Sequence, residues 1–321
     1  MLDKGTAATD DCPMVRIPGG RQRIPVVASL FCCFATGVSL PVKIRAADCR
    51  LGPVILVHGL GQDSSIFDHL IAGLAARGVP RDCLHAIDYP DSNLAIQQAA
   101  ENELAPYVER LLGKHAATGT RVNLVGHSMG ALSSRWYAAR LRPDRVRTWI
   151  STSGANHGTN WKCPQPDGTG HGDMCPAFAR HAGDSAVQVA LNGGPEPDVD
   201  ESPYGLGRDS AGVQHVAPDA TRSILYLTVQ VSRDPYIVPA ASLRLDGAGG
   251  VTLQLPARAP WRELAPGNFR YTEPSGHDEV LRSDALVDFI YLAISATRPE
   301  PGATTSTSDS VHRTWHSPQS S

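Results

Sequence analysis

The segment of this sequence best suited to covalent chemistry is Gly126-His127-Ser128-Met129-Gly130. It fits the pattern G-x-S-x-G and lies between an apolar run and a helical pattern, which is the context that this pattern requires. A serine on so sharp a turn has strained backbone angles, and glycines two residues to either side remove Cβ clashes and leave its hydroxyl exposed. The helix N-terminus behind it favours developing negative charge. We therefore predict Ser128 as a nucleophile; the alternative is an ordinary N-cap serine.

A serine hydroxyl is a poor nucleophile at neutral pH, so it needs a histidine base. His277 lies late in the chain, in the polar turn Ser275-Gly276-His277-Asp278-Glu279 before the last helical pattern, and is the predicted base. His127 flanks the nucleophile and is expected to point away from it. Other histidines fit less well, because they belong to the turn after the first strand or lie in or near a predicted insertion: His58, His157, His171, His181 and His215.

The histidine base needs a carboxylate to hold its tautomer. Asp234 follows an apolar run in the segment SRDPYIVP, so a carboxylate at a strand's C-terminal end can reach the base across the sheet. The alternative is a turn aspartate before proline, which is a common pairing. Asp278 is the main rival, but a residue adjacent to His277 cannot easily orient that ring. Asp234 is the predicted acid.

A tetrahedral oxyanion needs two preorganised N–H donors, one after the nucleophile and one from the turn after an early strand. Met129 is predicted to supply the first donor. The turn His58-Gly59-Leu60-Gly61 is predicted to supply the second through the Leu60 backbone. The alternative for this turn is a glycine-rich strand end without a role, although glycines let a backbone approach a substrate oxygen closely.

Short apolar runs alternate with amphipathic helical patterns along the chain, which predicts a parallel sheet flanked by helices. The predicted strands cover residues 54–57, 84–87, 122–125, 146–151, 224–231 and 251–255. The predicted helices cover residues 65–77, a long segment capped by Ser92 and kinked near Pro106, then 132–141 and 285–294.

The pattern breaks down between residues 154 and 219 into Gly, Pro, Asp and His, over a stretch too long for an ordinary connection. We interpret it as an inserted cap or lid within a catalytic domain of residues 48–297; the alternative is a disordered surface excursion. Residues 298–321 are rich in Ser, Thr and Pro, and are predicted to be a disordered tail.

The first 47 residues have the layout of a secretory signal peptide. Arg21 and Arg23 precede a mostly apolar run over 24–42, and cleavage is expected after Ala46 or Ala47. Met14 is a candidate start of translation, because the residues before it are polar and unlike the start of a signal peptide. The alternative is a membrane anchor, but polar residues and a proline interrupt the run. We predict a secreted protein without a stable membrane anchor after cleavage.

Cysteine usage agrees with export. Four cysteines would remain after cleavage, and an even number in an oxidising compartment predicts two disulfides. Three pairings are open: Cys163 with Cys175 would close a short loop, and Cys49 with Cys83 would tie the first strand to the segment after the first helix. No CxxC pair is present, so a zinc site is not expected.

The composition supports a globular chain, because 321 residues with 41% hydrophobic residues can bury a sizeable core. The net charge of −3 gives no field strong enough to indicate a nucleic-acid partner.

Several motifs together resemble the bacterial class 2 lipases and esterases of the α/β-hydrolase superfamily, over about residues 53–294. They are VILVHGLGQDSSIF, RVNLVGHSMGALSSRWY, STSGANHGTN, SRDPYIVP and GHDEV. The resemblance implies an α/β-hydrolase fold with a mostly parallel central sheet flanked by helices and a cap or lid insertion. Its matching positions are nucleophile Ser128, acid Asp234, base His277, and oxyanion residues Leu60 and Met129.

The same resemblance implies hydrolysis of carboxylic esters without a cofactor, by a triacylglycerol lipase or a carboxylesterase. Some relatives hold structural calcium, but no matching carboxylate cluster is found here. One departure is Ala131, where the family often has a second glycine, and activity is not expected to suffer. The expected partner is a lipid or small ester, bound by a monomer; binding in solution and binding at a lipid–water interface are both open. Polyhydroxyalkanoate depolymerase, thioesterase, acyltransferase and a non-catalytic binding protein are the alternatives.

Overall fold

The computed structural model describes residues 49–114, 120–179, 181, 183–192, 224–245, 248 and 253–296. The predicted signal peptide, the predicted tail and residues 193–219 of the predicted insertion lie outside these ranges. Within them, no helix has both the length and the apolar character needed to cross a bilayer.

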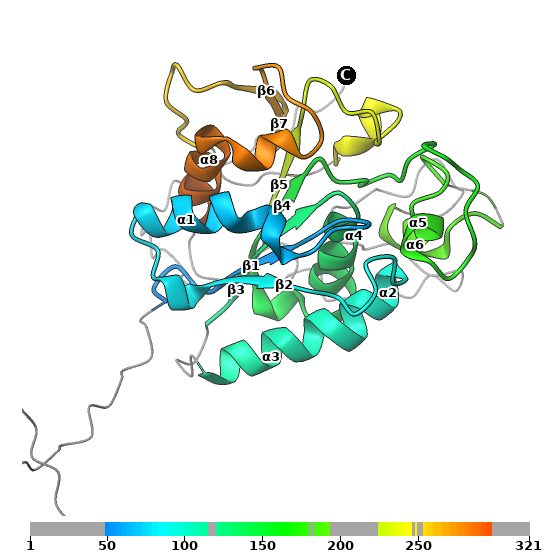
Figure 1. Cartoon of the computed structure of the whole chain (residues 1–321), viewed down its shortest axis with the longest axis horizontal. Helices are drawn as coiled ribbons and strands as arrows, with labels where there is room; N and C mark the ends of the chain where they lie inside the picture. Colours follow the sequence, from blue (N-terminus) through cyan, green and yellow to red (C-terminus); the bar gives the residue numbers. More distant parts are fainter. Residues whose placement is uncertain are drawn as a thin grey trace, which may run out of the picture. The chain divides into compact units, whose positions relative to one another are not determined.

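Seven strands form one sheet in the order β2-β1-β3-β4-β5-β7-β6 (Figure 1). Every neighbouring pair is parallel except β6 with β7. The strands are β1 Val54–Val57, β2 Leu84–Ile87, β3 Val122–His127, β4 Val146–Thr152, β5 Leu225–Gln230, β6 Trp261–Ala265 and β7 Asn268–Tyr271. A sheet of this kind is covered on both faces, which explains why its central strands read as continuous apolar runs. The predicted fold class is confirmed.

The expected strand over 251–255 is wrong where the structure describes it. Residues 253–255 are not in a strand, although Leu253 and Leu255 pack against the core. The sheet continues instead through the hairpin of β6 and β7, which turns at Gly267 with φ 72°. The pairing of Thr228 with Asn268 places β7 next to β5.

Alternate side chains of each strand enter two different cores. Ile55 and Val57 pack in one core with the helices α2 Ile96–Gln98, α3 Ala105–Lys114 and α4 Met129–Trp136. Val54 and Leu56 pack in the other core with the helices α1 Asp68–Ala76 and α8 Asp284–Ser295. This division follows from the period of two along a strand. The helices therefore cover opposite faces of the sheet (Figure 1).

Short turns complete these elements. The 3-10 turns are Ser64–Phe67, Arg81–Cys83, Pro143–Arg145, Ala240–Leu243 and Glu279–Arg282. A π-helical segment, Tyr137–Leu141, continues α4, and another, Ala99–Leu104, leads into α3. Pro106 is the second residue of α3, and its missing N–H fits the irregular segment that precedes this helix.

Ser92 does not cap the helical run that leads to α3, contrary to expectation. The run begins at Ile96, and its preceding residue Ala95 makes no side-chain cap. The Ile96 N–H instead donates to Asp173 Oδ2 over 2.7 Å. A carboxylate 77 positions along the chain thus does the work of a local cap, and no local sequence signal reveals it.

The described part of the predicted insertion packs against the fold. It contains the short helices α5 Gly170–Asp173 and α6 Ala186–Asn192. Arg135 of α4 is fully buried, and its guanidinium donates to the Leu191 carbonyl over 2.9 Å and to Asn192 Oδ1 over 2.7 Å. These bonds join α6 to the helix that follows the candidate nucleophile.

Two disulfides are present, and they select one of the three open pairings. Cys49 is bonded to Cys83 and Cys163 to Cys175. The first joins the segment before β1 to the turn before β2. The second closes the loop of residues 163–175, which contains Met174 and begins two residues after Trp161; both residues line the cavity described below.

Replacing both Cys49 and Cys83 by serine is expected to lower the free energy of unfolding by about 4 kcal/mol, because that bond closes a loop with a sequence separation of 34. Replacing Cys163 and Cys175 should cost about 3 kcal/mol, because the separation is 12. Urea unfolding of the two double variants measures both values. A larger loss from the shorter loop would contradict this order.

Candidate active site

Ser128 lies on the turn between β3 and α4 with φ 54° and ψ −123°. This conformation is strained for a residue with a side chain and persists only when its surroundings hold it. The flanking glycines make the turn sterically feasible. A Cβ on Gly130 would lie 2.2 Å from the Val57 carbonyl oxygen, and a Cβ on Gly126 would lie 2.5 Å from the Cα of Ala131. The sequence GHSMG thus forms the sharp strand-to-helix turn that its spacing predicts.

Ala131, the departure from the family pattern, is accommodated by a glycine elsewhere. Its side chain is fully buried. A Cβ on Gly154 would lie 2.4 Å from the Ala131 Cβ and 2.1 Å from Ser151 Oγ. The space that a second glycine would leave beneath the turn is therefore provided by Gly154 at the end of β4.

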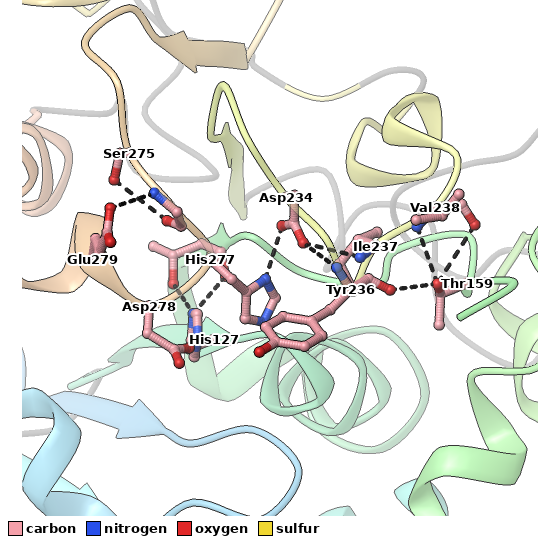
Figure 2. A network of polar contacts seen from close by, with 12 residues as sticks. His127, Thr159, Asp234, Tyr236, Ile237, Val238, Ser275, His277, Asp278 and Glu279 are labelled. Atoms are coloured by element: carbon pink, nitrogen blue, oxygen red, sulfur yellow. Dashed lines mark hydrogen bonds and ion pairs between the residues drawn. The ribbon is translucent and has the colours of Figure 1, made fainter. Parts of the chain in front are cut away.

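His277 and Asp234 form a buried pair (Figure 2). His277 Nδ1 lies 2.8 Å from Asp234 Oδ2, and the two side chains are 5% and 2% exposed. The other carboxylate oxygen of Asp234 accepts the backbone N–H groups of Tyr236 and Ile237 over 3.0 and 2.9 Å. Because both oxygens are engaged, the carboxylate has a fixed orientation toward the imidazole. The histidine therefore carries its proton on Nδ1 and leaves Nε2 free to act as a base.

Loops after two neighbouring strands bring this pair together. Asp234 follows β5 and His277 follows β7, and these strands pair in parallel. The Arg233 N–H donates to the Ser275 carbonyl oxygen over 3.2 Å, which ties the two loops to each other. The pairing of β5 with β7 therefore decides which carboxylate meets the histidine.

Ser128 and His277 line one cavity of about 270 Å³. The remaining lining residues are mostly apolar or aromatic: Leu60, Gln62, Thr159, Trp161, Met174, Tyr236, Ile237 and Asp278. Tyr236 packs edge-on against His277, and Trp161 packs edge-on against Tyr236, each with 5.0 Å between ring centroids. The cavity thus offers one nucleophilic oxygen and one base in largely apolar surroundings, as small-molecule sites commonly do.

The turn after β1 lies directly against the nucleophile. A Cβ on Gly59 would lie 2.7 Å from the Cβ of Ser128, so only glycine allows this approach. Leu60 follows in the same turn and lines the cavity, and Met129 is the first residue of α4. The two predicted oxyanion residues therefore flank Ser128 from two different elements.

His127 lies beside the base and has polar partners that its position in the sequence does not reveal. Its ring is fully buried, and its centroid lies 4.8 Å from that of His277. His127 Nε2 lies 2.8 Å from Asp278 Oδ1, and Nδ1 lies 3.0 Å from the Thr152 carbonyl oxygen. Asp278, the rival candidate for the catalytic acid, thus pairs with His127 and not with its sequence neighbour His277.

Burial lowers the pKa of His127 below its ordinary value. The hydrogen bond from His127, which outweighs the effect of burial, lowers the pKa of Asp278 to about 2. Asp278 is therefore a carboxylate at neutral pH and accepts the hydrogen bond from His127 Nε2.

Two groups of side chains in the described ranges have a spacing suited to a metal ion. One is Cys163, His171 and Cys175, whose cysteines are joined in a disulfide and offer no thiolate. The other is His127, His277 and Asp278; His127 is paired with Asp278, and His277 is paired with Asp234. Neither group is a cluster of carboxylates, the ligands that calcium prefers.

The pair of His127 and Asp278 predicts an acid-dependent stability. The pKa of Asp278 in the fold lies below its ordinary value of 3.8, so its ionised form stabilises the fold above about pH 4. This contribution should disappear as the pH falls from about 4 to about 2. Chemical unfolding of the wild type and Asp278→Asn at pH 6 and pH 2.5 measures it. The stability difference between the two proteins should shrink at the lower pH, and a constant difference would contradict the assignment.

Comparison with known proteins agrees with this geometry. A family model described as alpha/beta hydrolase fold matches residues 52–168, which include β1, the turn after it and the Ser128 turn. A triacylglycerol lipase of Pseudomonas fragi is 33% identical over 109 residues, covering 33% of this chain and 36% of the relative. One of Pseudarthrobacter phenanthrenivorans is 37% identical over 116 residues, covering 33% of each. The chain thus spans about a third of the length of these curated relatives.

Among solved structures, Aspergillus fumigatus lipase B aligns with 75% of this chain and 52% of its own, at 16% identity and a TM-score of 0.48. This likeness is too distant to carry an argument. The family match, the sheet order and the strained serine turn agree with one another. The chain has an α/β-hydrolase fold.

Proposed function

We propose that this protein hydrolyses carboxylic esters through an acyl-enzyme on Ser128. The observation that carries the proposal is the buried pair of His277 and Asp234, whose histidine lines the same cavity as the strained Ser128. A histidine held by a carboxylate can activate a serine hydroxyl, and a serine turn of this kind presents that hydroxyl to a substrate.

In the first half of the reaction, Ser128 Oγ attacks the ester carbonyl carbon, and its proton passes to Nε2 of His277. Asp234 stabilises the resulting imidazolium. The carbonyl oxygen becomes an oxyanion, which accepts the backbone N–H groups of Leu60 and Met129. His277 then protonates the leaving alcohol as the bond between the carbonyl carbon and the alcohol oxygen breaks. An acyl-enzyme remains.

In the second half, water gives a proton to His277 and attacks the acyl carbon. The second tetrahedral intermediate collapses, the bond to Ser128 Oγ breaks, and the serine recovers its proton from His277. The free acid leaves. Each step uses the same base and the same oxyanion donors, so atoms and protons balance over the cycle.

The substrate is proposed to be a triacylglycerol or a simpler carboxylic ester. The cavity wall supports an apolar acyl group, because Leu60, Trp161, Met174 and Ile237 contribute to it. The relatives named as triacylglycerol lipases support the same class. We propose further that the protein is a secreted monomer, and its two disulfides are typical of an oxidising compartment.

Ser128→Ala is expected to abolish hydrolysis of a p-nitrophenyl ester series from acetate to palmitate, because it removes the nucleophile. Spectrophotometry with and without emulsified lipid gives the chain-length preference. Preference for long chains with a rise at the emulsion supports a lipase, and preference for short soluble esters supports a carboxylesterase. Absence of turnover by the folded wild type on every ester would overturn the proposal.

Asp234→Asn is expected to lower kcat by up to about 10⁴-fold, because the amide no longer holds the His277 tautomer. Steady-state kinetics on the best ester of the series measures the change. A matched control is Asp82→Asn, which changes an exposed aspartate in the 3-10 turn before β2 and should leave kcat unchanged. Similar kinetics for the two variants would remove Asp234 from the mechanism.

A further inference from the structure

A chain of side-chain hydrogen bonds joins the turn after β1 to the loop that carries the base. The Gly59 N–H donates to Gln62 Oε1 over 3.0 Å, and Gln62 Nε2 donates to Asp278 Oδ1 over 2.9 Å. The same Asp278 oxygen lies 2.8 Å from His127 Nε2. Three segments that are distant in sequence, around residues 59, 127 and 278, are thus held by one carboxylate oxygen.

The direction of every bond in this chain is determined by chemistry. The backbone N–H of Gly59 can only donate, and the Asp278 carboxylate can only accept. An amide side chain between them satisfies both when its oxygen faces Gly59 and its nitrogen faces Asp278. Glutamate at position 62 would offer no donor to Asp278, and an apolar residue would offer neither bond.

The same turn fixes the peptide group between Gly59 and Leu60. The Gly59 carbonyl oxygen accepts the Gln62 backbone N–H over 3.3 Å and the His58 Nδ1–H over 2.9 Å. His58 is buried, and its Nε2 accepts the Tyr89 N–H, so its proton is on Nδ1. In a trans peptide the N–H points opposite to the C=O, so fixing the Gly59 carbonyl also fixes the direction of the Leu60 N–H.

We propose that Gln62 and Asp278 are positioning residues for the oxyanion donor Leu60. Asp278 is held by His127 and anchors Gln62, and Gln62 holds the peptide groups on both sides of Gly59, the first through its side chain and the second, Gly59–Leu60, through its backbone N–H. The inference rests on the proposed function, because Leu60 acts on the oxyanion only if an ester is cleaved at Ser128. It adds two residues that line the cavity beside Ser128 and His277.

The proposal gives the base loop and the oxyanion turn a direct link. His277 and Asp278 are consecutive, so the loop that presents the base also anchors the turn that presents the donor. A displacement of either would disturb both. This arrangement suits transition-state stabilisation, because a displacement of about 1 Å at a catalytic group can cost on the order of 10²-fold in rate.

The first test is Gln62→Met, which keeps the side-chain length and removes both side-chain hydrogen bonds. The expected result is a fall in kcat of about 10- to 100-fold with KM and Tm nearly unchanged, because an oxyanion donor acts in the transition state. The matched control is Gln97→Met on the exposed surface of α2, whose amide donates to Glu101 Oε1, and it should match the wild type.

A second measurement does not depend on ester cleavage. Hydrogen exchange of the Gly59 backbone amide should be faster in Gln62→Met than in Gln97→Met, because the acceptor of that amide is removed. If the wild-type protein shows no Ser128-dependent turnover, the proposed function is wrong. If the wild type turns over and Gln62→Met has the same kcat, only the positioning role is wrong. Unchanged exchange at Gly59 would also sink it.

A third comparison uses Asp278. Asp278→Asn keeps an oxygen that accepts from both Gln62 and His127, so kcat should remain within a few-fold of the wild type, whereas Asp278→Leu should lower kcat as Gln62→Met does. The kcat of the double variant Gln62→Met/Asp278→Leu should be no lower than that of the less active single variant, because the two residues act in series. Additive losses, a rise in KM alone, or a fall in Tm that accounts for the lost activity would each overturn the proposal.

Discussion

The strained backbone of Ser128 is the constraint on which the rest of the site depends. A residue with φ 54° and ψ −123° persists only where its neighbours leave no better alternative. Here α4 is pressed against the end of β1 so closely that Gly130 has no room for a side chain beside the Val57 carbonyl. The buried parallel sheet supplies the rigid edge that resists relaxation. The Ser128 turn also requires glycine at position 59 and space beside Ala131, which Gly154 provides.

Around this turn, the polar groups fall into two sets that share one place. The pair of His277 and Asp234 is buried among the loops after β5 and β7, and its histidine lines the cavity. The pair of His127 and Asp278 lies beside it, with 4.8 Å between the two imidazole centroids. One pair is suited to moving a proton, and the other to fixing distance and direction. Asp278 thus pairs with His127 and not with His277, its neighbour in sequence.

Much of the fold could be predicted from local pattern. The strands β1 to β5 appear as apolar runs close to their observed bounds, and α1 ends at Ala76, two residues before Gly78, whose φ of 91° favours glycine. Local pattern did not predict the hairpin of β6 and β7 or the start of the helical run at Ile96. Each depends on a distant partner: β5 for the hairpin, and Asp173 for the N-terminus at Ile96. A local pattern carries no information about a bond made across 77 residues.

The sequence by itself determined the residues that could do chemistry, because the G-x-S-x-G spacing, the chain order of acid and base, and the glycine-rich turn each express a local steric or chemical requirement. Only the tertiary structure decided their partners. Strand order brought Asp234 and not Asp278 to His277, and the packing of three loops gave His127 and Gln62 a common acceptor. The reason is physical: a hydrogen bond depends on distance and direction in space, and these arise only when the sheet and its loops are assembled.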